Sequence, residues 1–149
     1  MTTQELEKFF RKKAQRSGST NFVKLRRNWI RSVNALYDEI EIKYLARLIK
    51  EKVLTITRRR KMLFEEDLGE YSIDDLEINV GDERAIFSPK GHRIVGAQGR
   101  LDLEGDRGVV TLVLNLGRWS IVASRTPTLR LVPLDEKTLL QAMKDVMRT

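Results

Sequence analysis

The side chains with the clearest chemistry are two groups of lysines and arginines. A guanidinium group binds phosphate through two parallel hydrogen bonds, and neutralising several phosphates releases counterions. Both groups are therefore candidates for binding an anion or a nucleic acid, and Trp29, which lies within the first group, could stack on a base. The two groups are Lys24, Arg26, Arg27 and Arg31, followed by the unbroken run Arg58, Arg59, Arg60 and Lys61.

The positive charge is concentrated in the first part of the chain. Residues 1–61 contain 17 lysines and arginines against 6 aspartates and glutamates, whereas residues 62–149 contain 11 against 15. Such a polarised distribution indicates that the basic part meets an anion. That anion could be a nucleic acid, an acidic membrane surface or the acidic part of this chain. In a competing interpretation, the cations form a solvated helix face and Trp29 belongs to the core.

A second candidate is the stretch 89–100, which is rich in glycine and cations. It superficially suggests a phosphate loop, but the Gly-Lys-Ser/Thr ending that opens a helix in such loops is missing. Turns and a bulge between strands account for its glycines. His92 and Arg93 at the tip of this loop could contact an anionic ligand. His92 is the only histidine, and no nucleophile-elbow motif accompanies it, so a serine triad is not supported.

Carboxylates give weaker candidates for catalysis. Asp102 and Glu104 share one face of an expected strand and could hold Mg²⁺. One type of nuclease combines such paired acids with a nearby lysine on a strand, but no Glu-x-Lys follows on this strand. Pairing of these acids with charges on neighbouring strands is the better interpretation. We therefore expect a protein that is not an enzyme, with no catalytic residue, no metal ligand and no cofactor.

The elements that position these residues follow from hydrophobic periodicity. Apolar residues recur every three or four positions from Phe22 to Leu48, which predicts a long helix. We expect an α+β fold: an N-terminal helical arm over about 3–16 and 20–51, an antiparallel meander sheet or half-barrel over about 53–133, and a C-terminal helix over about 135–148. The long helix could also break near Asp38. Residues 1–52 would form the basic arm and 53–149 the β domain with its closing helix.

The meander is clearest between residues 100 and 123. Stretches 100–104, 109–114 and 119–123 are rich in alternating or β-branched residues, and turn signals containing Gly105, Gly108 and Gly117 separate them. Short strands followed by a helix that begins after Pro133 resemble the pleckstrin-homology type of barrel, in which the last helix closes one end. The resemblance lies in the order of elements and implies a binding module.

Composition limits the remaining possibilities. The chain has no cysteine, which excludes disulfides and thiolate metal sites. It contains no apolar run of about 20 residues and no signal-peptide pattern, so we expect a cytoplasmic protein without a membrane span. The sequence favours an interaction module that binds a protein partner, or itself, through the N-terminal helices. The alternative is a nucleic-acid-binding accessory protein that uses the basic arm.

Overall fold

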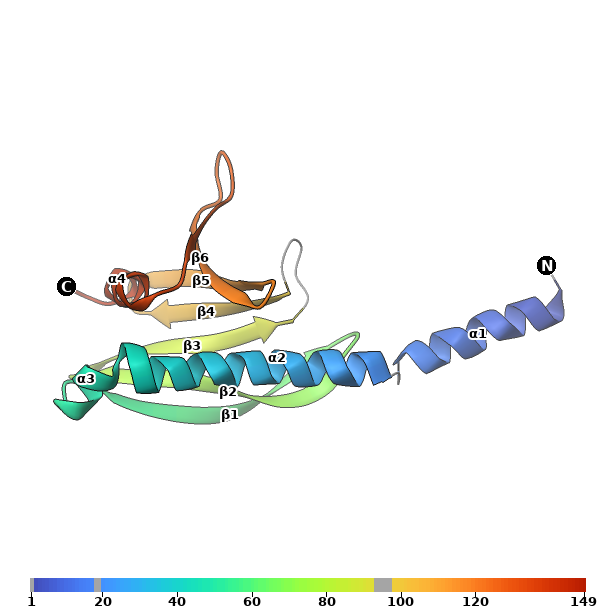
Figure 1. Cartoon of the computed structure of the whole chain (residues 1–149), viewed down its shortest axis with the longest axis horizontal. Coiled ribbons are helices and arrows are strands. Elements are labelled where there is room, and N and C mark those ends of the chain that lie inside the picture. The colour runs from blue at the N-terminus through green and yellow to red at the C-terminus, as the bar shows by residue number, and fades with distance from the viewer. Residues whose placement is uncertain (1, 18–19, 93–97) are drawn as a thin grey trace.

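The computed structural model describes residues 2–17, 20–92 and 98–149, and for residues 14–17, 20 and 21 it describes the backbone alone. The described residues form an N-terminal helical region, a seven-stranded antiparallel sheet and a C-terminal helix, which confirms the predicted α+β fold. The helices are α1 (Thr3–Ser17), α2 (Thr20–Glu39), the π-helical turn η1 (Ile40–Tyr44), α3 (Ala46–Lys50) and α4 (Glu136–Val146). In Figure 1, α1 extends away from the body that the other elements form.

The predicted long helix is interrupted close to the expected position. After Glu39 the chain widens into η1, in which the Leu45 amide donates to the Ile40 carbonyl at 2.8 Å, and α3 then continues to Lys50. Lys52 has a positive φ of 59°, a left-handed conformation that ends a helix. The helical arm therefore ends where the periodicity ends, and the chain turns back into the sheet.

The strands follow one another across the sheet in sequence order, so every neighbour is antiparallel. The first and last strands do not pair with each other, and the sheet is open rather than closed into a barrel. The strands are β1 (Thr55–Glu65), β2 (Gly69–Val80), β3 (Glu83–Gly91), β4 (Gly99–Gly105), β5 (Gly108–Asn115), β6 (Arg118–Ser124) and β7 (Arg130–Pro133).

Both α2 and α4 cover the same face of the sheet. A Cβ atom added to Gly99 would lie 2.2 Å from a ring carbon of Trp29 in α2, and one added to Gly105 would lie 2.3 Å from the Val146 carbonyl oxygen in α4. The two glycines are six residues apart on β4, so they point to the same side. Their lack of side chains lets both helices approach the strand closely, and the core fills the space between helices and sheet.

Tyr37 anchors α2 to the sheet at the point where β2 and β3 separate. Its hydroxyl donates a 2.7 Å hydrogen bond to the Asp74 carbonyl and lies 3.2 Å from the Phe87 carbonyl. Pairing of β2 with β3 begins only at Leu76, so these carbonyls lie at the edge of the ladder. Burial, together with nearby Asp75, raises the pKa of Tyr37 well above its ordinary value.

Candidate functional site

The four consecutive cations of β1 do not form one surface. Arg58 turns toward the helices, where it donates to Glu41 at 3.0 Å and to Asp38 at 2.7 Å. Its guanidinium lies 5.5 Å from the centre of the Tyr37 ring. The hydrogen bond to Glu41 is the main reason why the pKa of Arg58 lies above its ordinary value. Arg58 therefore connects β1 to the end of α2 and to η1.

The other three cations also meet acids of this chain. Arg59 donates to Glu77, Arg60 lies 3.8 Å from Asp74, and Lys61 lies 2.7 Å from Asp75. Lys61 also donates to the Ser88 hydroxyl and to the Pro89 carbonyl. Glu77 has Arg84 as a second partner at 3.4 Å, and the bond from Arg59 is the main reason that its pKa is lowered.

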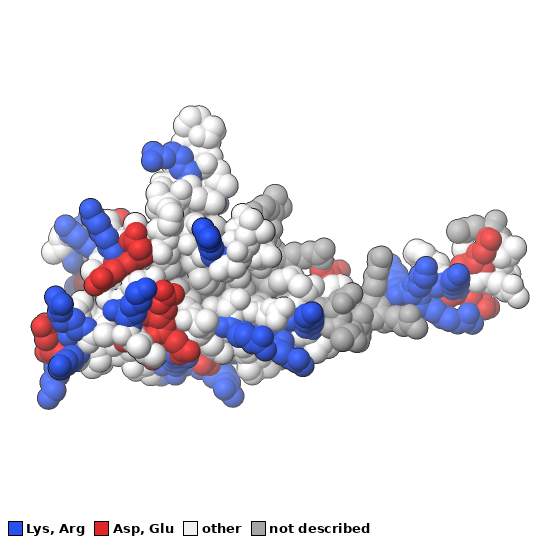
Figure 2. Space-filling model, viewed as in Figure 1, with Lys and Arg blue, Asp and Glu red and all other residues white. Residues whose placement is uncertain are grey.

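The cations of α2 are different, because most of them have no acidic partner. Within the described part of the chain, Lys24, Arg27 and Arg31 make no hydrogen bond and no ion pair, and all three are exposed. Arg26 donates at 3.0 Å to the Leu68 carbonyl at the turn between β1 and β2. Figure 2 shows basic side chains along α2 without acidic neighbours, whereas the two charges mix around the far end of the body. The eight predicted cations thus divide into a paired group on β1 and a largely free group on α2.

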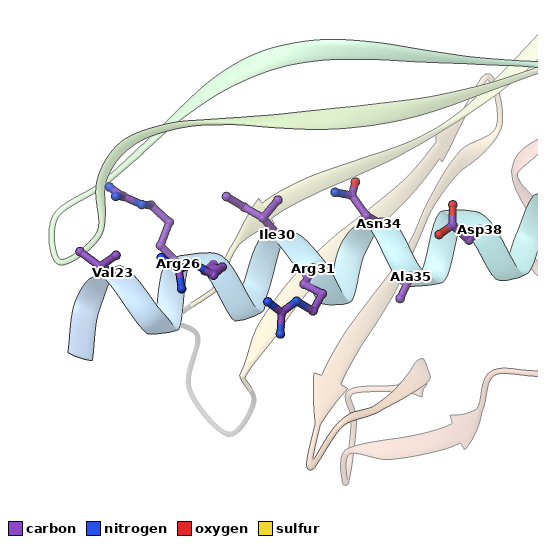
Figure 3. A pocket seen from close by; sticks show the side chains of 8 residues that line it. Val23, Arg26, Ile30, Arg31, Asn34, Ala35 and Asp38 are labelled. Carbon is purple, nitrogen blue, oxygen red and sulfur yellow. The ribbon is translucent and has the colours of Figure 1, made fainter. Parts of the chain in front are cut away.

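Three of the α2 cations line one groove. The groove has a volume of about 560 Å³, and Figure 3 shows it alongside the β1–β2 hairpin, toward which Arg26 extends. Ile30 and Val23 give it apolar surface, and Asp38 lies at one end. Lys24 does not line the groove, so the structure brings Arg26, Arg27 and Arg31 together and leaves Lys24 outside. The full lining is Val23, Arg26, Arg27, Ile30, Arg31, Asn34, Ala35 and Asp38.

The apolar stripe of α2 is used inside the molecule. Trp29 is only 2% exposed, Val33 is fully buried, and Phe22 packs partly buried against the core. The Trp29 indole donates to the Tyr71 hydroxyl at 3.1 Å, and its ring lies 6.0 Å from that of Trp119. The interpretation of Trp29 as a core residue is therefore correct. This stripe is not available for a base or for a partner helix.

The apolar side of α1, by contrast, faces solvent. Leu6 is 43% exposed, Phe9 55% and Phe10 64%. The two phenylalanine rings contact each other edge to face, with centroids 5.3 Å apart. Lys8, Lys12 and Lys13 are exposed around them, and none forms an ion pair with a residue that the structure describes. An amphipathic helix with its apolar side uncovered is a departure from a self-contained domain.

The predicted loop site is only partly described. Arg93 lies outside the described residues. The His92 side chain is not at an exposed tip: its Nδ1 lies 4.0 Å from Glu65, whose carboxylate accepts a 3.0 Å hydrogen bond from the His92 amide. Glu65 also accepts from the Tyr71 hydroxyl. Burial and this bond raise the pKa of Tyr71 well above its ordinary value. A carboxylate beside His92 makes this position a poor place for an anionic ligand.

The carboxylates of the strands are engaged in pairs. Asp102 accepts from Arg100 at 2.9 Å and from Thr111 at 3.1 Å, and Glu104 lies 2.7 Å from Lys90. Among the described residues no group of three or more histidines, cysteines or acids is arranged to hold a metal ion. Glu104 therefore pairs with a charge on the neighbouring strand β3, as the sequence pattern predicted, whereas Asp102 pairs with Arg100 on its own strand β4.

The comparisons give this chain no relative. No family model matches it, no curated protein matches it, and no solved structure matches it. Of the helices in the described ranges, none is both long and apolar enough to cross a membrane. The candidate functional surfaces are thus the apolar side of α1 and the groove of α2. The groove residues Ile30, Asn34 and Asp38 were not among the predicted site residues, although their spacing along one helix face was a usable signal.

Proposed function

We propose that this chain is a non-enzymatic interaction module that docks on a partner protein through α1. The partner presents an apolar groove whose rim is acidic. The observation that carries this proposal is the exposure of Leu6, Phe9 and Phe10 on one side of α1. These residues occupy positions i, i+3 and i+4, which are the anchor positions of an amphipathic helix that binds in a groove.

The charge around the anchors supports the acidic rim. Lys8, Lys12 and Lys13 have no acidic partner within the described residues, whereas Arg11 is paired at 3.2 Å with Glu7. Unpaired lysines beside an apolar stripe favour an acidic rim over a neutral one, because complementary charge steers association and excludes wrong partners. Because the apolar stripe of α2 is buried, we propose α1 rather than the whole helical arm as the docking element.

The nucleic-acid alternative has less support. Four of its eight predicted cations pair with acids on the chain's own strands and helices. Trp29, the aromatic residue that could have stacked on a base, is buried. A protein partner is therefore the better proposal, with nucleic acid as an outcome that the experiment below can detect.

Site-specific photo-crosslinking tests the proposal. A photoreactive phenylalanine analogue replaces Phe9 in one variant and Leu116 in the control, since Leu116 is 83% exposed on the turn between β5 and β6. In extracts of the producing organism, the Phe9 variant should give a discrete protein adduct that Phe10→Asp abolishes and an excess of a synthetic α1 peptide prevents. The Leu116 variant should give no such adduct.

Three results would overturn this account. The first is an equal pattern of adducts from both positions, which would mean random contact. The second is an adduct of twice the 17.3 kDa chain mass, which would identify a second copy as the occupant. The third is an adduct that nuclease removes, which would identify nucleic acid.

A further inference from the structure

We propose that the groove of α2 binds a small phosphomonoester, with the phosphate held between Arg27 and Arg31. The two arginines are four residues apart, so they lie on neighbouring turns of the same helix face. Both are exposed, and neither has a partner among the residues that the structure describes. Two guanidinium groups without an acid are matched in charge to a phosphomonoester, which carries close to two negative charges at neutral pH.

Arg26 gives the groove a fixed wall. Its guanidinium is held at 3.0 Å by the Leu68 carbonyl, and its side chain is partly buried. Because a guanidinium has five donors, this one bond leaves others free for a ligand. Figure 3 shows Arg26 and Ile30 extending to the side of α2 that faces the β1–β2 hairpin. The side chain is therefore already positioned before a ligand arrives.

The rest of the groove fits the organic part of such a ligand. Ile30 and Val23 supply apolar surface, and Asn34 supplies an amide that can donate and accept. The groove has a volume of about 560 Å³ and is open to solvent, so it would contact one side of a small ligand. The groove thus combines a phosphate clamp with a short apolar and hydrogen-bonding surface on one rigid helix.

The end of the groove argues for a small ligand over a polymer. Asp38 lies there, and although Arg58 neutralises it at 2.7 Å, none of the described residues that line this end is an unpaired cation. A nucleic acid strand would bring further phosphates to this end, and the described lining there offers no free positive charge to receive them. A single terminal phosphate avoids that cost.

NMR titration of the full chain tests the inference, with the Nε–Hε signals of the arginines as reporters. Inorganic phosphate and ribose 5-phosphate are the probes, at about pH 8, where the phosphate is mostly dianionic. We expect saturable shifts of the Arg27 and Arg31 signals, with ribose 5-phosphate binding more tightly than phosphate. Arg27→Gln and Arg31→Gln should each weaken binding by about tenfold. Lys24→Gln, on the same helix but outside the groove, should change affinity less than about twofold.

Absence of saturable shifts with both probes would overturn the inference. Equal weakening by Lys24→Gln would also overturn it, because it would reveal unspecific attraction to a basic surface. A single-stranded oligonucleotide that binds more tightly than ribose 5-phosphate, and loses affinity in all three variants, would assign the surface to nucleic acid instead. Crosslinking at Phe9 should be unaffected by Arg27→Gln, so this result is independent of the docking role of α1.

Discussion

The Nη2 atom of Arg58 lies 2.7 Å from the Oδ1 atom of Asp38, and this contact connects the edge strand of the sheet to the end of α2. The same guanidinium holds Glu41 in η1 at 3.0 Å. The run Arg58–Lys61, which the sequence predicted as a binding site, therefore forms ion pairs within the protein itself. The contrast with the unpaired Arg27 and Arg31 separates structural cations from those available to a ligand.

Substitution of Arg58 should test its structural role. Its side chain is 28% exposed and holds two carboxylates, so Arg58→Gln should lower the free energy of unfolding by about 1–2 kcal/mol. Arg60→Gln is the matched control, since Arg60 is 78% exposed and 3.8 Å from Asp74, and it should cost less than about 0.5 kcal/mol. Urea denaturation measures both. Equal losses would show that Arg58 is no more engaged than an ordinary surface charge.

Removal of the Tyr37 hydroxyl should lower the stability of the protein although only one oxygen atom is lost. Tyr37→Phe removes the hydroxyl that donates to the Asp74 carbonyl and lies 3.2 Å from the Phe87 carbonyl, which should lower the free energy of unfolding by about 1–3 kcal/mol. The control is Tyr44→Phe. The Tyr44 hydroxyl donates an exposed 2.8 Å hydrogen bond to the Glu39 carboxylate, and its loss should cost less than about 0.5 kcal/mol. If the two variants unfold at the same urea concentration, the anchoring role of Tyr37 is wrong.

The free energy of unfolding should depend on pH in a way that reflects the lowered pKa of Glu77. Its bonds from Arg59 and Arg84 hold its pKa below the ordinary value of 4.5 in the folded state. As the pH falls below about 4.5, the unfolded chain takes up a proton before the folded chain does, so the free energy of unfolding decreases. Glu77→Gln removes this contribution, and its stability should fall less steeply between about pH 5 and pH 3.

Arg59→Gln removes one of the two bonds that lower the pKa of Glu77. The free energy of unfolding of this variant should therefore fall with decreasing pH less steeply than that of the wild type, but more steeply than that of Glu77→Gln. Chemical denaturation at several pH values measures the slopes. A Glu77→Gln variant with the slope of the wild type would mean that the Arg59–Glu77 bond does not persist in solution.

Local patterns were sufficient to predict the sheet. The alternation in 100–104 and the glycines at 105, 108 and 117 are confirmed as β4, β5 and their turns, because strand faces and tight turns depend on residues close in sequence. The limits of the helical arm were predicted for the same reason. The π-helical turn at Ile40–Tyr44 has no comparable local signal, and only a break near Asp38 was anticipated.

The site depended on contacts between distant residues. Arg58 meets an acid twenty positions earlier, and Lys61 meets Ser88 twenty-seven positions later, so no local pattern could separate paired from free cations. Whether Trp29 stacks on a base or belongs to the core could not be decided from the sequence for a similar reason. The helical period shows that it lies on an apolar stripe, but only Gly99, seventy positions away, makes room for its ring against β4.

Hydrogen exchange of α1 tests the central claim most directly. A helix of 15 residues whose described side chains, from Thr3 to Lys13, are all exposed is marginally stable, so in the purified chain the amides from Glu5 to Lys13 should exchange rapidly while those of β4 and β5 stay protected. In the complex captured through Phe9, the same α1 amides should become protected and those of β5 should not change. Slow exchange of α1 in the purified chain would contradict the account, because it would mean that Leu6, Phe9 and Phe10 are already covered by the protein itself.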